Sequence, residues 1–190
     1  MSGTGSAWDR ATGTIVRVYL SIAITLFCTC TWQPAAATDK IAASLRDAHK
    51  LVECMEAFNG GCVVKRTYNE YLYRQGASAD QITRNVRDLY MQLKAMGGKF
   101  TRFDLAQPQA IDSSDTREFV FIPYDQVLQL KGREHQSKAY FIGVSDDHGE
   151  TWRFVDGMRI NDKNIRLIIP GYAGTPPLPP IYSEVPASGT

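Results

Sequence analysis

Two residues of this 190-residue chain are candidates for acid–base catalysis, and neither belongs to a recognised catalytic motif. His49 lies beside the apolar stripe of an expected helix, and imidazole exchanges protons near neutral pH. Asp104 alternates with Phe103 and Leu105 in an expected strand, and a carboxylate that faces a pocket can act as a base. The alternation favours a solvent-facing Asp104, and a surface position is the ordinary one for His49. The sequence therefore identifies no catalytic residue and favours binding over catalysis.

Three tyrosines are candidates for ligand binding. Tyr68 and Tyr71 fall in one expected helix, and Tyr90 falls in the next. Tyrosines on the inner face of a helix can line a pocket and donate hydrogen bonds to a ligand. They can equally be core aromatics whose hydroxyls reach water, and this second interpretation is the more common outcome.

The segment 145–152, SDDHGETW, carries the most specific motif in the chain. Its signature residues are Ser145, Asp147, Gly149, Thr151 and Trp152. On these positions it resembles the Asp-box of sialidases and related propellers, written S-x-D-x-G-x-T-W. The resemblance implies a β-hairpin turn with a structural role. An aspartate can accept backbone N–H groups across such a turn, a glycine can adopt positive φ, and a tryptophan can pack beneath it.

The alternative that this resemblance leaves open is a site for glycans. A propeller needs several blades, whereas this chain has one such motif and is too short, so the structural hairpin is favoured. A calcium site at Asp146 and Asp147 is a weaker alternative, because the EF-hand spacing of oxygen ligands is absent. Four cysteines and three histidines form no zinc-ligand pattern. We therefore expect no metal and no cofactor.

The N-terminal segment has the features of an export signal. Arg10 and Arg17 precede an apolar run, VYLSIAITLFCTC, and an A-x-A cleavage site follows. We expect residues 1–37 to be a signal peptide that directs the chain to the periplasm or to secretion, with no membrane association after cleavage. The alternative is an uncleaved anchor through 18–32, although a spanning helix needs about 20 apolar residues.

Two cysteines remain after that cleavage, Cys54 and Cys62. Cys54 falls in the last turns of the first expected helix, and Cys62 follows a pair of glycines that lets the chain reverse. An exported protein meets an oxidising compartment, so the sequence predicts a disulfide between them. The alternative is two reduced cysteines with one of them packed in the core.

The composition is that of a globular chain, with 44% hydrophobic and 22% charged residues, and it excludes global disorder. Basic and acidic residues number 21 and 20, so no basic excess indicates nucleic acid as a partner. Apolar spacings of three and four predict helices over about 39–59, 63–73 and 78–96. In the last of these, Ser78 and Gln81 form a capping-box pair, and Leu89 belongs to the apolar stripe. Alternation predicts strands at 99–106, 117–123, 126–131, 138–145, 151–156 and 164–169. In 119–122 two phenylalanines alternate with Val120 and Ile122, so this strand is expected to be covered on both faces.

This order predicts an α+β fold in which two to three N-terminal helices pack on a curved antiparallel sheet of about five to six strands. One domain would cover 38–172, and residues 173–190 would form a Pro-rich tail that is extended or disordered. Over about 39–170 the order of elements resembles the NTF2-like (SnoaL-like, cystatin-like) superfamily. That resemblance implies a cone with a pocket between sheet and helices, but it carries over no functional residue.

The resulting hypothesis is an exported domain that binds a small molecule or a protein. One alternative is a pocket enzyme of the isomerase or dehydratase type that uses a buried carboxylate or histidine. Another is a structural, envelope-associated homodimer formed through an exposed sheet face. A titratable group buried in a cavity beside a tyrosine hydroxyl would favour the enzyme, and an apolar lining would favour binding alone.

Overall fold

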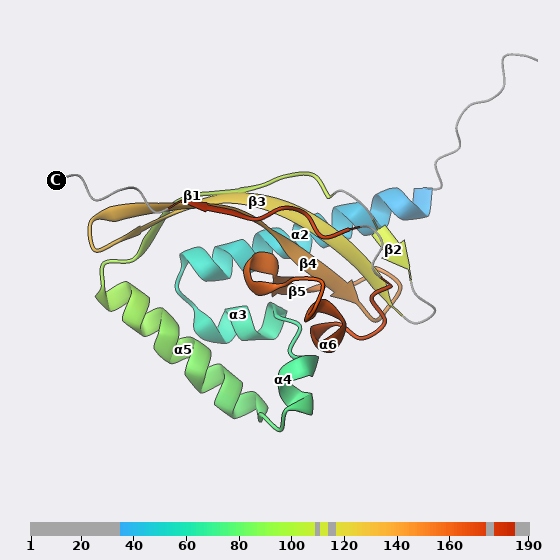
Figure 1. Ribbon diagram of the computed structural model, residues 1–190, viewed down its shortest axis with the longest axis horizontal. Coiled ribbons are helices and arrows are strands. Elements are labelled where there is room, and N and C mark those ends of the chain that lie inside the picture. Colours follow the sequence, from blue (N-terminus) through green and yellow to red (C-terminus); the bar gives the residue numbers. More distant parts are fainter. Residues whose placement is uncertain (1–34, 109–110, 114–116, 174–176, 185–190) are drawn as a thin grey trace, which may run out of the picture. The chain divides into compact units, whose positions relative to one another are not determined.

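The structure is a computed structural model that describes residues 35–108, 111–113, 117–173 and 177–184 (Figure 1). The expected signal peptide and the alternative anchor lie outside this part of the chain, except for Ala35–Ala37, which begin the first helix. Among the described helices, none has the length and apolar character needed to cross a membrane. The predicted α+β fold is confirmed: helices pack with one antiparallel sheet.

The sheet is four strands across rather than the expected five to six. In spatial order the strands are β1 (Lys99–Leu105), β3 (Glu118–Leu130), β4 (Arg133–Ser145) and β5 (Arg153–Asp156). Two three-residue segments pair beside the central strands without widening the sheet: β2 (Ile111–Ser113) with β3, and β6 (Tyr182–Glu184) with β4. The sequence predicted neither segment.

The long hairpin of β3 and β4 organises the sheet. Lys131 and Gly132 form its turn, both with positive φ, as a two-residue hairpin loop requires. The expected strands 117–123 and 126–131 are in fact the single strand β3. Pro123 does not interrupt it, because this residue pairs opposite Tyr140 while its carbonyl accepts the N–H of Ala106 at the end of β1.

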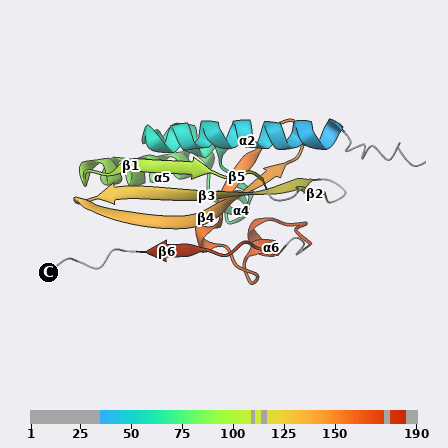
Figure 2. The same ribbon diagram turned by 90° about the horizontal axis from the view of Figure 1, so that it is seen from above.

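Both faces of the central strands are buried, as the alternation in 119–122 predicted. Val120 and Ile122 belong to one core cluster, which contains side chains of α2 (Ala35–Glu56). Phe119 and Phe121 belong to a second cluster on the other face, with residues of the C-terminal segments. Figure 2 shows this layering, with α2 on one side of the sheet and α6 with β6 on the other.

The later helices differ from the prediction in two places. The expected helix 63–73 is two helices, α3 (Gly60–Arg66) and α4 (Glu70–Arg74), separated by extended backbone at Thr67. The expected strand 164–169 is wrong, since Ile165–Ile168 form helix α6. Asn161 explains the difference: its side-chain oxygen accepts the N–H groups of Lys163 and Asn164 and starts a helical turn. The short 3-10 helix η1 (Gly157–Arg159) precedes this turn.

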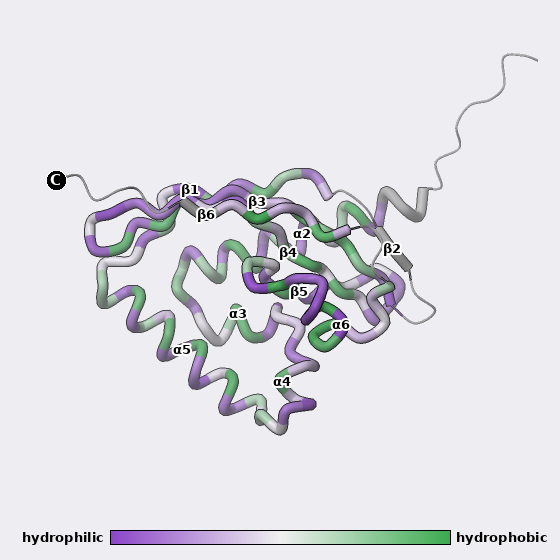
Figure 3. Tube along the Cα trace, viewed as in Figure 1, coloured by the Kyte–Doolittle hydropathy of each residue, from purple (hydrophilic) through white to green (hydrophobic). Residues whose placement is uncertain are grey.

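Helix α5 (Ala79–Ala95) begins as predicted, with the hydroxyl of Ser78 accepting the N–H of Gln81. It packs against α3 rather than on the sheet. At Gly60 the two helices approach so closely that an added Cβ would lie 2.7 Å from the Cα of Arg87. The expected apolar stripe of α5 is therefore covered only in part, and Leu89 is 52% exposed. Figure 3 shows the hydrophobic and hydrophilic segments that alternate along this helix.

The predicted disulfide between Cys54 and Cys62 is confirmed. It joins the end of α2 to the first turns of α3, and the two Cα atoms are 5.6 Å apart. Asn59 caps α3 by accepting the N–H of Cys62 at 3.1 Å. The bond therefore fixes the reversal between the two helices.

The C-terminal region returns to the sheet. Residues 177–181, PLPPI, which we call the proline strap, lead into β6. Leu178 packs against the second core cluster, and β6 pairs with 136–138 of β4. This part of the expected tail is extended and attached to the domain.

Candidate functional site

The turn between β4 and β5 contains the Asp-box-like residues. Asp147 accepts hydrogen bonds from the Ser145 hydroxyl at 2.8 Å and from the Thr151 N–H at 2.9 Å and hydroxyl at 2.6 Å. Gly149 has φ +90 and donates its N–H to Ser145 Oγ at 2.8 Å. The indole N–H of Trp152 donates to the carbonyl of Gly149 at 3.0 Å. The five signature residues thus bond one another across the turn.

The electrostatics of Asp147 follow from these bonds. Partial desolvation alone would raise its pKa, but hydrogen bonds from Thr151 and Ser145 stabilise the carboxylate and lower the pKa to about 2. A carboxylate whose two oxygens are both engaged inside a turn holds that turn together. Ligand recognition would require these bonds to open.

The same turn receives helix α2. Asp47, buried on α2, accepts the backbone N–H of Trp152 at 3.2 Å. Lys40 of α2 forms an ion pair with Glu118 of β3, directly against Gly149, where an added Cβ would lie 2.6 Å from Lys40 Cγ. The turn therefore joins α2 to the sheet, which supports a structural role.

The two candidate catalytic residues lie on different elements, and no described contact joins them. His49 is exposed on α2. The side chain of Asp104 on β1 is 69% exposed and forms an ion pair with Arg102 at 3.4 Å. Both therefore occupy the surface positions that the sequence favoured.

The three candidate tyrosines have different surroundings within the described residues. Tyr68 is buried; its hydroxyl donates to Glu70, and burial followed by this bond raises its pKa above the usual range. Tyr90 is buried edge-on against Phe58, with ring centroids 5.8 Å apart, and burial raises its pKa to about 12. Tyr71 is half-buried on α4. Tyr68 and Tyr90 have the packing of core aromatics.

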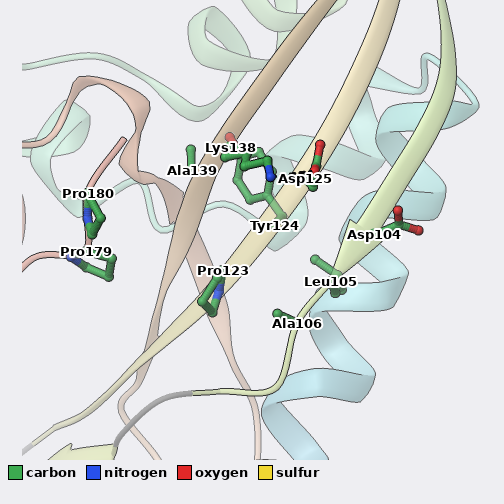
Figure 4. Close-up of a pocket in the computed structure, with 10 residues that line it drawn as sticks. All are labelled: Asp104, Leu105, Ala106, Pro123, Tyr124, Asp125, Lys138, Ala139, Pro179 and Pro180. Carbon is green, nitrogen blue, oxygen red and sulfur yellow. Dashed lines mark ion pairs between the residues drawn. The ribbon is translucent and has the colours of Figure 1, made fainter. Parts of the chain in front are cut away.

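A pocket of about 350 Å³ lies between the sheet and the proline strap (Figure 4). Its lining comes from β1, β3 and β4 on one side and from the strap on the other. The apolar lining residues are Leu105, Ala106, Pro123, Ala139, Pro179 and Pro180, and the others are Asp104, Tyr124, Asp125 and Lys138. Only Asp104 of these was a candidate from the sequence, because the pocket depends on the return of the C-terminal segment to the sheet.

Charged side chains at the edge of this pocket form ion pairs. Asp125 accepts a hydrogen bond from Arg102 at 2.7 Å and lies 3.5 Å from the ammonium group of Lys138. Partial desolvation alone would raise the pKa of Asp125, but Arg102 and Lys138 lower it. The rim therefore offers charge of both signs beside an apolar wall.

One carboxylate that the sequence did not single out pairs with a buried tyrosine. Asp156, at the end of β5, accepts the hydroxyl of Tyr124 at 2.9 Å and the N–H of Met158 at 2.9 Å. Asp156 is exposed as a residue, and its Oδ1 accepts both of these hydrogen bonds. Desolvation there raises the pKa of Asp156 despite these hydrogen bonds. Its sequence neighbours gave no signal, because the contact spans 32 residues.

Comparison of the sequence with protein-family models and with curated proteins finds no match.

Proposed function

We propose that this protein is an exported binding domain for small molecules, and that its site is the pocket between the sheet and the proline strap. The observation that carries the proposal is the pocket itself. Its volume of about 350 Å³ lies within the range of about 300–1,000 Å³ that is usual for ligand sites. A ligand there would contact strands and strap together.

The lining supports a ligand with an apolar body and at least one charged or strongly polar group. Leu105, Pro123 and Pro179 offer apolar surface for the body. Asp104 and Lys138 have charged groups at the rim that can orient the polar end. Both signs of charge are present, so a zwitterion or an amine suits this rim better than a hydrocarbon does.

This site differs from the one that the NTF2-like resemblance implies. In a cone-shaped member the pocket lies between the sheet and the helices. Here aromatic rings pack on one another in the core cluster that contains α2: Tyr124 lies 5.1 Å from Phe103 and 4.7 Å from Phe141 between ring centroids. The proposed pocket instead involves the C-terminal strap.

The proposal can be tested by mapping fragment binding on the whole protein. A library of small neutral, cationic and zwitterionic compounds would be titrated into isotope-labelled protein while backbone amide shifts are recorded. We expect the shifts to cluster at the pocket residues that carry an amide N–H, 104–106, 124–125 and 138–139. Ala106→Phe, which adds a ring at the pocket wall, should abolish them.

Ala95→Phe is the matched control, because Ala95 is exposed at the end of α5 and does not line this pocket. It should leave the shifts intact. Fragments that bind equally well to Ala106→Phe and to the unmodified protein would contradict the proposal, as would the absence of any fragment that shifts the pocket amides.

A second candidate function, a proton-transfer enzyme, is favoured by the hydrogen bond between Asp156 and Tyr124. A carboxylate with a raised pKa beside a tyrosine hydroxyl can abstract a proton next to a carbonyl group. The test is deuterium exchange into simple cyclic ketones in D2O. Exchange that the protein accelerates and that Asp156→Asn abolishes would support this candidate; equal exchange with and without protein would contradict it.

A further inference from the structure

Tyr140 is a buried polar residue that the fold leaves unsatisfied. It is 0% exposed, and its hydroxyl has no hydrogen-bond partner among the described residues. Such a group costs free energy in a core, so most buried hydroxyls are bonded to protein or to a ligand or water. A ligand or water that bonds to this hydroxyl would therefore remove that cost.

A second pocket, of about 290 Å³, adjoins Tyr140. The strap contributes Pro177, Leu178, Pro179 and Ile181 to it, and among the described residues only Pro179 lines both pockets. Its apolar lining comes from Ile160, Leu178 and Ile181. Its polar lining comes from Asn161 and Asp162 in the loop after η1 and from Tyr140 itself. These residues form an open pocket that has both an apolar wall and a polar edge.

Tyr140 is one of the residues that line this pocket, and its hydroxyl is buried. The ring edge packs on Gly157, where an added Cβ would lie 2.4 Å from Cε2. Asp162, which lines the pocket, is near enough to affect the hydroxyl: desolvation first, then Tyr172 and Asp162, raise the pKa of Tyr140 to about 12. The hydroxyl therefore remains protonated at neutral pH and is available as a donor.

We propose that this second pocket is a binding site for a small molecule that presents a carbonyl or amide oxygen to the Tyr140 hydroxyl and an amine to Asp162. The acceptor satisfies the buried hydroxyl. The amine meets the carboxylate at the edge of the pocket. An aliphatic body occupies the space between Ile160, Leu178 and Ile181. Compounds of the amino-amide class have all three parts.

The test uses leucinamide, with two comparison compounds that each lack one feature. 4-Methylpentanamide keeps the amide and lacks the amine, and leucine replaces the amide by a carboxylate. Each is titrated into the full chain while amide shifts are recorded. We expect leucinamide to bind most tightly, with shifts at the lining residues that carry an amide N–H, 140, 160–162, 178 and 181.

Tyr140→Phe removes the hydroxyl and keeps the ring. It should weaken leucinamide binding at least roughly tenfold and leave the melting temperature unchanged or higher, because the lost group has no partner. Asp162→Asn should remove the preference for leucinamide over 4-methylpentanamide. Tyr73→Phe, at an exposed tyrosine of α4, is the matched control and should change neither property.

Three results would overturn the proposal. Equal leucinamide affinity in Tyr140→Phe would show that the hydroxyl does not take part. A lower melting temperature for Tyr140→Phe would show that the hydroxyl already has a structural partner, such as a fixed water. No binding of leucinamide at about 10 mM would exclude this ligand class. None of these results affects the first pocket, whose test uses Ala106→Phe.

Discussion

Two regions differ in how their polar groups are hydrogen-bonded. One is the turn between β4 and β5, and the other is the sheet face beneath the proline strap. In the turn, Asp147 accepts three hydrogen bonds from its neighbours, and the indole of Trp152 is also bonded. Beneath the strap, the hydroxyl of Tyr140 is buried with no hydrogen-bond partner in the part of the chain that the structure describes. The signature groups of the turn are thus bonded to one another, although Glu118 Oε2 beside Gly149 has no hydrogen-bond partner among the described residues. The Tyr140 hydroxyl differs in that it belongs to a residue that lines a pocket, where we propose that a ligand binds it.

This difference separates a structural motif from a binding site. Bonds that are already made within a turn stabilise the fold and are lost if a ligand competes for them. A group that the fold leaves unsatisfied beside a pocket gains a bond when a ligand enters. The most recognisable motif in the chain is therefore the less suitable of the two regions for ligand recognition.

The largest effect is expected in the turn. Trp152 is buried in the core cluster that contains α2, so Trp152→Ala should lower the free energy of unfolding by about 3–5 kcal/mol. Chemical denaturation measures this loss. Arg153→Ala, at the exposed neighbour, is the control and should change stability little. A stable Trp152→Ala variant would contradict the structural role of the turn.

Gly149→Ala should have the next largest effect. The position has φ +90, and an added Cβ would lie 2.6 Å from Lys40 and 2.8 Å from the Glu118 carboxylate. Backbone strain and displacement of the ion pair together should cost about 2–3 kcal/mol. Gly132→Ala separates the two causes, because Gly132 has φ +76 with open space around it. Equal losses in the two variants would show that Lys40 and Glu118 do not constrain the turn.

Asp147→Asn should cost about 1–2 kcal/mol near pH 7, because the amide cannot accept all of the bonds that the carboxylate accepts. The pKa of Asp147 in the fold, about 2, lies below its ordinary value of 3.8. Its contribution to stability is therefore complete above 3.8 and is lost as the pH falls toward 2.

Thermal melts recorded from about pH 6 down to about pH 2 measure this dependence of stability on pH. The unmodified protein should lose more stability over this window than Asp147→Asn does. Asp88→Asn, on the exposed face of α5, is the control and should follow the unmodified protein. Parallel profiles for Asp147→Asn and the unmodified protein would refute the proposed bonding of Asp147.

The smallest effect on stability is expected beneath the strap. Leu178 is only half-buried against the second core cluster, so Leu178→Ala should cost about 1 kcal/mol. It lines the second pocket and should weaken leucinamide binding there. Leu167→Ala, at a leucine that is 52% exposed, is the control for loss of a surface leucine. A loss for Leu178→Ala as large as that for Trp152→Ala would remove the contrast between the two regions.

The parts of the fold that depend on near neighbours were predictable from the sequence. The Ser78 cap, the Cys54–Cys62 bond and the two-faced burial of 119–122 all rest on residues a few positions apart. The error at 164–169 also has a local cause, because the apolar run there suits a strand as well as it suits a buried helical turn that Asn161 starts.

The candidate sites were largely beyond the reach of the sequence. Asp156 meets Tyr124 across 32 residues, and β6 pairs with 136–138 only after the chain has returned to the sheet. No spacing rule relates such positions. Periodicity also predicted that Leu89 belongs to the core, but α5 packs on α3 and leaves this residue exposed. Local patterns identify elements, whereas pockets depend on how distant elements meet.

An amide-shift map of the full chain shows whether ligands bind beside the strap or at the turn. The protein would be titrated with leucinamide, with the fragment library and with a panel of monosaccharides. We expect shifts at residues that line the two pockets beside the strap, and no shift of the amides of 145–152 with any compound. Shifts confined to 145–152, above all with a sugar, would contradict this expectation, because the turn and not the strap face would then be the binding site.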